Sequence, residues 1–186
     1  MMQEILSRAW FMGQGCKRLE VNYHGRTVVR WAHPDGYFLN PQGRKIAHIF
    51  SPSTQRAALD PNRKTGKGYP GLRECCSQKC HIIMALAFYG PRPTFFDKNG
   101  KPYVGICHHL IPDAFDYRPA NLLCYLTRPQ HAEADRRQRA LRKVLPDMHA
   151  ISYERHRWLQ DPRTTSREVF ETELQALRIK YLILNS

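Results

Sequence analysis

The feature that most constrains this chain is a pair of adjacent histidines, His108 and His109, at the end of an apolar segment. Asn121 follows His109 by twelve residues, and His131 follows Asn121 by ten. Successive side chains of an extended segment point to opposite faces, so the two adjacent imidazoles can take different roles at one strand end. Imidazoles bind divalent cations in their neutral form and accept protons near neutral pH. These four residues are therefore candidates for a metal-dependent site.

Turn and capping residues predict the elements around these histidines. Residues 95–107 are expected to form a hairpin around a turn at 97–100, with the second strand ending at His108 and His109. Residues 122–126 are expected to form another short strand. Thr127 and Gln130 form a capping-box pair, which predicts a helix from about residue 128 to residue 143. The predicted order is strand, loop, strand, helix.

This order and these residues resemble the HNH endonucleases, nearest to the phage and mobile-element type, over about residues 80–145. The resemblance implies a ββα-metal (His-Me finger) nuclease core. It also implies that His109 is the general base and that Asn121 supports the geometry of that histidine. His108 and His131 would bind the metal ion. The implied reaction is metal-dependent hydrolysis of DNA by water, which leaves a 5′ phosphate and a 3′ hydroxyl.

The helix offers one further candidate ligand. Asp135 lies one turn after His131 on the same helical face, so its carboxylate can reach the same cation. Phosphodiester hydrolysis requires a nucleophilic water, charge neutralisation at the phosphate and stabilisation of the leaving oxygen. We expect one divalent metal ion. Mg or Mn is favoured because substrate phosphate oxygens would join the ligands, and Zn or Ni also suits imidazoles with one carboxylate.

The net charge favours a polyanionic partner. The chain carries 29 Lys and Arg against 16 Asp and Glu, a formal net charge of +13, which raises the local concentration of nucleic acid. Double-stranded DNA is the expected partner. A basic helix can also be only a solvated face, which is the alternative interpretation. The residues predicted to contact phosphate are Arg118, Arg136, Arg137, Arg139, Arg142 and Lys143.

The rest of the chain predicts an α+β protein with three regions. Residues 1–75 are expected to hold antiparallel strands within 17–50 and a basic loop at 51–73. Residues 76–145 would form the nuclease core, beginning with a helix capped by Ser77 and ending at Gly90. Residues 146–186 would form a helical extension, with one helix over 149–160 and another opened by Thr165 and Glu168.

An apolar stripe marks the last predicted helix. We expect this stripe to dock on the core, although its spacing also fits a short heptad seam, so a homodimer through this helix is the alternative. The stripe consists of Phe170, Leu174, Leu177, Tyr181 and Leu184.

Six cysteines in 186 residues are too few for a disulfide scaffold, and the sequence has no signal peptide or apolar run of membrane-spanning length. We therefore expect a cytoplasmic protein with reduced thiols and no membrane partner. Cys75, Cys76, Cys80 and His81 could instead form a structural zinc site, but no CxxC pair repeats at zinc-knuckle spacing. A third hypothesis is a nucleic-acid-binding protein or regulator that keeps the HNH-like fold and does not cut. Metal-dependent cleavage of DNA is expected only of the nuclease, and stoichiometric zinc in the purified protein is required only by the zinc site.

Overall fold

The computed structural model describes residues 6–23, 26–46, 48–49, 71–72, 79–113 and 115–183. These residues form helices and small antiparallel sheets, which confirms the predicted α+β class. The chain divides into two compact units. The first comprises Met1–Pro91 with Asp113–Pro119, and the second comprises Arg92–Pro112 with Ala120–Ser186. These divisions differ from the expected boundaries after residues 75 and 145.

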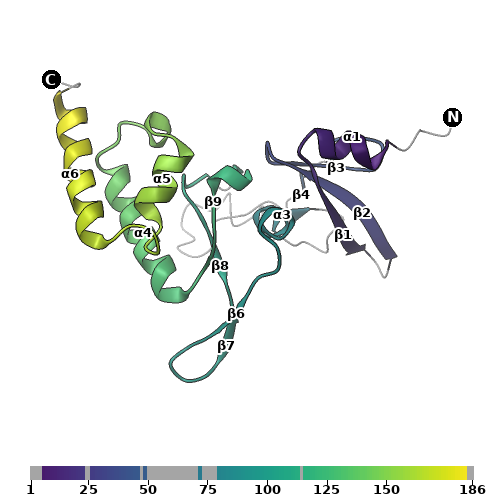
Figure 1. Ribbon diagram of the computed structural model, residues 1–186, viewed down its shortest axis with the longest axis horizontal. Helices are drawn as coiled ribbons and strands as arrows, with labels where there is room; N and C mark the ends of the chain where they lie inside the picture. Colours follow the sequence, from purple (N-terminus) through teal and green to yellow (C-terminus); the bar gives the residue numbers. More distant parts are fainter. Residues whose placement is uncertain are drawn as a thin grey trace. The chain divides into compact units, whose positions relative to one another are not determined.

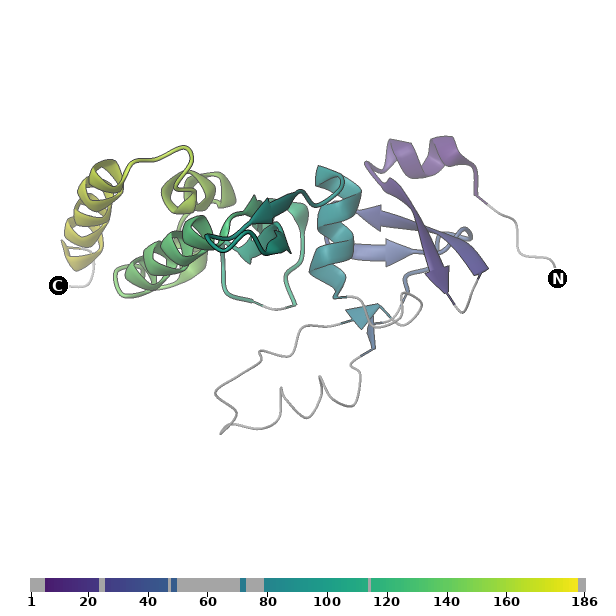
Figure 2. The same cartoon turned by 90° about the horizontal axis from the view of Figure 1, so that it is seen from below.

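The first unit is built on a three-stranded antiparallel sheet in the order β1-β2-β3, in agreement with the strands predicted within residues 17–50. Helix α1 lies along this sheet (Figures 1 and 2), where Phe11 stacks on Trp31 with ring centroids 4.4 Å apart. A separate pair of short strands, β4 and β5, is also antiparallel. The elements are α1 (Arg8–Gly13), β1 (Lys17–Tyr23), β2 (Arg26–His33), β3 (Tyr37–Leu39), β4 (His48–Ile49) and β5 (Gly71–Leu72).

Helix α3 (Cys80–Tyr89) packs against β1 and ends at Gly90, as the sequence predicts. Gly90 has φ +80°, a conformation that glycine adopts without steric cost. The predicted cap, Ser77, lies outside the described residues.

The segment Asp113–Pro119 completes the first unit. Tyr117 is 1% exposed and its ring stacks near Phe38, with centroids 6.2 Å apart. The hydroxyl of Tyr89 donates a hydrogen bond to the carbonyl of Pro119 at 2.7 Å. A loop of the chain thus supplies part of the core of the first unit.

The second unit begins with two strand pairs. Strands β6 (Thr94–Phe96) and β7 (Pro102–Val104) form a hairpin, and β8 (Ile106–His109) pairs with β9 (Leu122–Leu126). The expectation that the second strand of the 95–107 hairpin runs on unbroken to His108 and His109 is wrong, because the chain changes its pairing partner at Gly105. A side chain at Gly105 would place its Cβ 3.1 Å from the Cα of Tyr125, a tight contact that the neighbouring backbone would have to shift to accommodate, and glycine avoids it.

Three helices follow, and they pack together in Figure 1. They are α4 (Arg128–Arg142), α5 (Tyr153–Gln160) and α6 (Arg167–Ile183). The Thr127–Gln130 capping box is present, which confirms the predicted start of α4. Helix α5 begins later than expected because residues Met148–Ala150 form a 3₁₀ turn and Ser152 caps the helix. Ser166, rather than Thr165, accepts the capping bond of α6 from Val169, at 3.2 Å.

The described part of the α6 stripe packs within its own unit, as predicted, and Leu184 lies outside the described residues. Phe170, Leu174 and Leu177 are buried in one cluster with Leu141 of α4 and Leu159 of α5. The C-terminal helices therefore share a core with the helix that carries His131. Among the described helices, none combines the length and the apolar character that a membrane crossing requires.

Candidate metal centre

Strand β8 delivers the two adjacent histidines. His108 lies opposite Leu123 of β9 and His109 lies opposite Leu122, with a register irregularity between Ile106 and His108. Both histidines are buried, at 4% and 7% exposure. The strand pair therefore holds both imidazoles in a largely dry environment, where polar groups must be matched by partners.

Helix α4 brings His131 and Asp135 to the same place. The capping box fixes where the helix begins, and the separation of four residues places both side chains on one face. Ala134, on the same helix, is fully buried against Leu110, Leu123 and Leu126, which docks α4 on the β8–β9 pair.

His108, His131 and Asp135 form a cluster in which one ligand atom of each residue lies within 4.8 Å of the other two. The Nδ1 atom of His108 is 3.2 Å from Asp135 Oδ1, and the Nδ1 atom of His131 is 3.6 Å from Asp135 Oδ2. Within the described part of the chain, this is the one group of three or more such residues that could hold a metal ion. The three predicted ligands are thus brought together.

The electrostatics of the cluster favour the protonation states that a cation requires. Burial lowers the pKa of His131, and the nearby His108 lowers it further, against the opposing effect of Asp135. A hydrogen bond with His108 holds the pKa of Asp135 below its ordinary value. A neutral imidazole and an ionised carboxylate are the forms that bind metal.

The donor set fits a divalent cation with open positions. Two imidazole nitrogens and one carboxylate oxygen suit first-row transition metals, and the carboxylate also suits Mg or Mn. The side chains of His131 and Asp135 are 30% and 39% exposed, whereas that of His108 is 4% exposed. The cluster is therefore anchored in the interior on one side and reachable from solvent on the other.

Asn121, the predicted support for His109, is fully buried and clamps the chain just beyond that residue. Its side-chain oxygen accepts a hydrogen bond from the Ile111 amide at 2.8 Å, and its side-chain nitrogen donates to the Ile111 carbonyl at 3.2 Å. Its backbone carbonyl accepts from the Leu110 amide at 2.9 Å. These bonds fix where the chain leaves β8.

Two buried glutamines contact His108, and the sequence analysis did not identify either of them. The Oε1 atom of Gln160 lies 3.0 Å from His108 Nε2. The amide nitrogen of Gln138 donates to the carbonyls of His109 and Leu110. Gln138 lies three residues after Asp135 on the same helical face, a signal that could have revealed it. Gln160 is 52 residues from His108, and no local pattern connects the two.

The six residues predicted to contact phosphate lie in different environments. Arg139, Arg142 and Lys143 are exposed on α4, and together they are called here the α4 basic face. Arg136 is paired with Glu133 and Glu171. These cations do not form one uniform surface.

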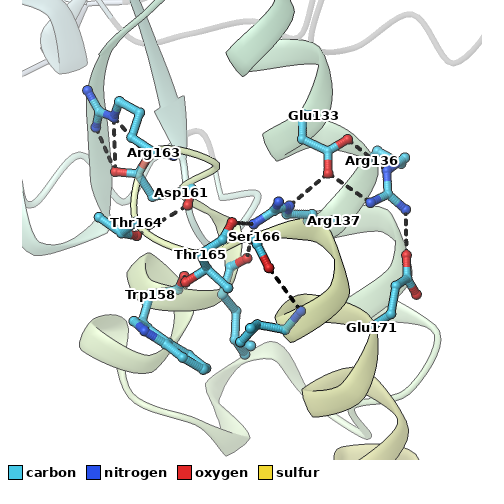
Figure 3. Close-up of polar contacts among 12 residues, drawn as sticks. Glu133, Arg136, Arg137, Trp158, Asp161, Arg163, Thr164, Thr165, Ser166 and Glu171 are labelled. Carbon is cyan, nitrogen blue, oxygen red and sulfur yellow. Dashed lines mark hydrogen bonds and ion pairs between the residues drawn. The ribbon is translucent and has the colours of Figure 1, made fainter.

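Arg137 and Arg118 are engaged with other protein groups. Arg137 is 2% exposed and donates hydrogen bonds to Glu133 and to the carbonyls of Leu159 and Thr165, so its guanidinium is held in the interior. Figure 3 shows Arg137 between Glu133 and Thr165. Arg118 belongs to the first unit, where it forms two hydrogen bonds with Asp116.

A groove between α4 and α6 adds a cation that the sequence analysis did not consider. Arg178 of α6 lines it with Arg136, Arg139 and Lys143, and Ala140 and Leu174 also contribute.

The alternative zinc cluster is only partly within the described residues. Cys75 and Cys76 lie outside them, whereas Cys80 and His81 are buried in α3. No two of Cys16, Cys80, Cys107 and Cys124 form a disulfide with one another.

Comparison of the whole chain with protein-family models, with curated proteins and with solved structures finds no match.

Proposed function

We propose that this chain is a metal-dependent endonuclease of the HNH type that hydrolyses phosphodiester bonds of double-stranded DNA. The observation that carries the proposal is the convergence of His108, His131 and Asp135, with His109 the next residue after His108 in β8. The order β8, loop, β9, α4 also agrees with the strand–strand–helix arrangement that the resemblance implies.

His109 accepts the proton of the attacking water. A histidine is suited to this role because its ordinary pKa lies near neutral pH. Asn121 positions His109 indirectly, by holding Leu110 and Ile111 at the exit of the strand. Attack by water at phosphorus breaks the bond to the 3′ oxygen and leaves a 5′ phosphate and a 3′ hydroxyl.

His108, His131 and Asp135 would hold the divalent cation. When bound, such a cation neutralises charge at the scissile phosphate and stabilises the leaving 3′ oxygen. The open side at His131 and Asp135 is where the substrate phosphate can approach, because those two side chains are the more exposed members.

The α4 basic face holds the DNA backbone. Arg139 and Arg142 extend from the same helical face as His131 and Asp135, so they continue that face from the proposed centre toward the end of α4. Contacts between cations and phosphates depend little on sequence, so this face provides affinity rather than base recognition. Arg137 is not included, because its guanidinium is bonded within the protein.

Cleavage of supercoiled plasmid with Mg²⁺ or Mn²⁺, and with a chelator, tests the function. We expect His109→Ala to cut about two to four orders of magnitude more slowly under single-turnover conditions, because a general base contributes about that much. Mn²⁺ affinity should be preserved. His149→Ala is the matched control, since His149 is exposed on the same unit and outside the cluster.

A wild-type rate in His109→Ala would exclude His109 as the base. If the wild-type chain binds DNA but does not cut it with any divalent cation tested, the nuclease proposal fails. The nucleic-acid-binding function is then the better description.

A further inference from the structure

A buried chain of polar groups leads from helix α5 to the candidate centre. Gln160 and His156 are both fully buried, and each uses its polar atoms on protein groups. Gln160 contacts His108 Nε2 through Oε1 at 3.0 Å, and its amide nitrogen contacts the Leu110 carbonyl at 2.9 Å and His156 Nδ1 at 3.0 Å. His156 Nε2 contacts the Met148 carbonyl at 2.6 Å. A buried network of this kind is costly unless every group has a matching partner.

The carbonyl of Leu110 sets the orientation of the Gln160 amide. A carbonyl oxygen only accepts hydrogen bonds, so the group facing it must be the amide NH₂. The amide oxygen of Gln160 then faces His108. Because that oxygen is also only an acceptor, the Nε2 atom of His108 must carry the proton in this contact.

The carbonyl of Met148 sets the tautomer of His156 by the same argument. Nε2 of His156 must donate to this carbonyl, which leaves Nδ1 as the acceptor in a neutral ring. Burial lowers the pKa of His156 and so favours the neutral ring, although the bond to Met148 opposes this effect. Nδ1 then accepts the second amide hydrogen of Gln160, which confirms the same amide orientation from the other end.

Gln138 offers the competing arrangement. Its amide nitrogen lies 3.3 Å from His108 Nε2 and could donate to that atom if the nitrogen carried no proton. The carbonyls of His109 and Leu110 already accept the two hydrogens of the Gln138 amide, and both of these contacts are shorter than the one to His108 Nε2. An unprotonated Nε2 would also face the Gln160 oxygen, acceptor against acceptor.

We propose that Gln160, oriented by the carbonyl of Leu110 and by His156, keeps a proton on His108 Nε2, so that Nδ1 is the atom that gives up its own proton to Asp135 or solvent and binds the cation. Nδ1 is the atom that faces Asp135, at 3.2 Å. Gln160 and His156 are thus positioning residues for a metal ligand. The inference depends on the metal site of the proposed function but not on DNA cleavage.

Nuclear magnetic resonance of the wild-type full chain tests the tautomer directly. Long-range proton–nitrogen correlations of the protein loaded with Zn²⁺, a diamagnetic cation, show which nitrogen of each imidazole carries a proton. We expect the Nε2–H pattern for both His108 and His156. An Nδ1–H pattern for His108, or equal populations of both, would overturn the inference without any variant.

Two matched variants test the consequence for metal binding. Gln160→Met removes the acceptor of His108, whereas Gln138→Met removes the competing donor at similar side-chain length. Calorimetry with Mn²⁺ and Ni²⁺ should give an affinity about 10- to 100-fold weaker for Gln160→Met, because outer partners of histidine ligands have effects of that size. The Nε2–H signature of His108 should also be lost in Gln160→Met and kept in Gln138→Met.

An effect on affinity and tautomer confined to Gln138→Met would show that Gln138 sets the tautomer, and would refute the proposal. Equal losses in both variants would indicate only a general structural effect and would also refute it. None of these measurements uses DNA, so a chain that binds metal and cuts nothing would disprove the nuclease function while leaving the tautomer result intact.

Discussion

Arg137 is the buried cation that links α4 to the segment before α6, and replacing it with methionine tests how that link is stabilised. Its Nε donates to Glu133 at 2.8 Å, and Nη1 donates to the carbonyls of Leu159 at 3.1 Å and Thr165 at 2.9 Å. Figure 3 shows this guanidinium between Glu133 and Thr165. Methionine would keep the apolar stem and remove every donor.

The expected loss of stability follows from the hydrogen-bond acceptors that Arg137→Met leaves without this donor. Glu133 retains its two hydrogen bonds from Arg136 and is 27% exposed, so it contributes little to the loss. The carbonyls of Leu159 and Thr165 lose a buried donor, and each such loss costs about 1–2 kcal/mol. We expect Arg137→Met to reduce the stability of the second unit by about 2–4 kcal/mol, near the lower end of the range for breaking a buried ion pair.

Hydrogen exchange of α5 and α6 peptides measures this loss in the second unit alone. The expected change corresponds to about 30- to 1,000-fold faster exchange of the most protected amides, since about 1.4 kcal/mol is tenfold. Arg136→Met is the control, because it loses Glu133 and Glu171 at the surface and should cost about 0–1 kcal/mol. Equal acceleration in the two variants would refute the argument from the buried carbonyls.

Two further predictions concern charge. Hydrogen bonding with Arg136 is the main cause that lowers the pKa of Glu133 to about 2 from 4.5, so the stability it contributes is complete above about pH 4.5 and is lost as pH falls toward 2. In urea unfolding, Glu133→Gln should remove about 1–2 kcal/mol of the change in stability between these pH values, after allowance for solvent screening, whereas Glu168→Gln should leave that change intact. The prediction is contradicted if stability falls with pH in Glu133→Gln as it does in the wild type. Arg142→Gln should lower the slope of log DNA affinity against log salt by about 0.9 for every DNA sequence, and Arg167→Gln on α6 should change it less. A slope that Arg142→Gln leaves unaltered would place the DNA surface elsewhere.

The parts of the centre set by local sequence could be predicted. Thr127 and Gln130 determine where α4 begins, and the spacing of four residues then places His131 and Asp135 on one face. The position of His108 at a strand end follows from the apolar run before it. These inferences need only short-range geometry, which the sequence contains.

The parts set by long-range packing could not be predicted. Gln160 reaches His108 across 52 positions, and its role depends on how α5 docks. Arg137 was expected at a phosphate because charge alone does not distinguish a solvated arginine from a buried one. Its spacing from Ala134 and Leu141 does place it near the apolar stripe, which is the signal that indicates burial.

The path of the chain between His109 and Asn121 has a consequence for how this protein can evolve. The chain leaves the second unit after Pro112, contributes the buried ring of Tyr117 to the first, and returns at Ala120. A gene fragment ending at Pro91 would lack that ring, and one beginning at Arg92 would carry it without Phe38. Recombination at a single breakpoint therefore cannot exchange either unit whole. The two units are expected to be inherited together, and any transplant of the candidate centre into another protein must redesign the segment Asp113–Pro119.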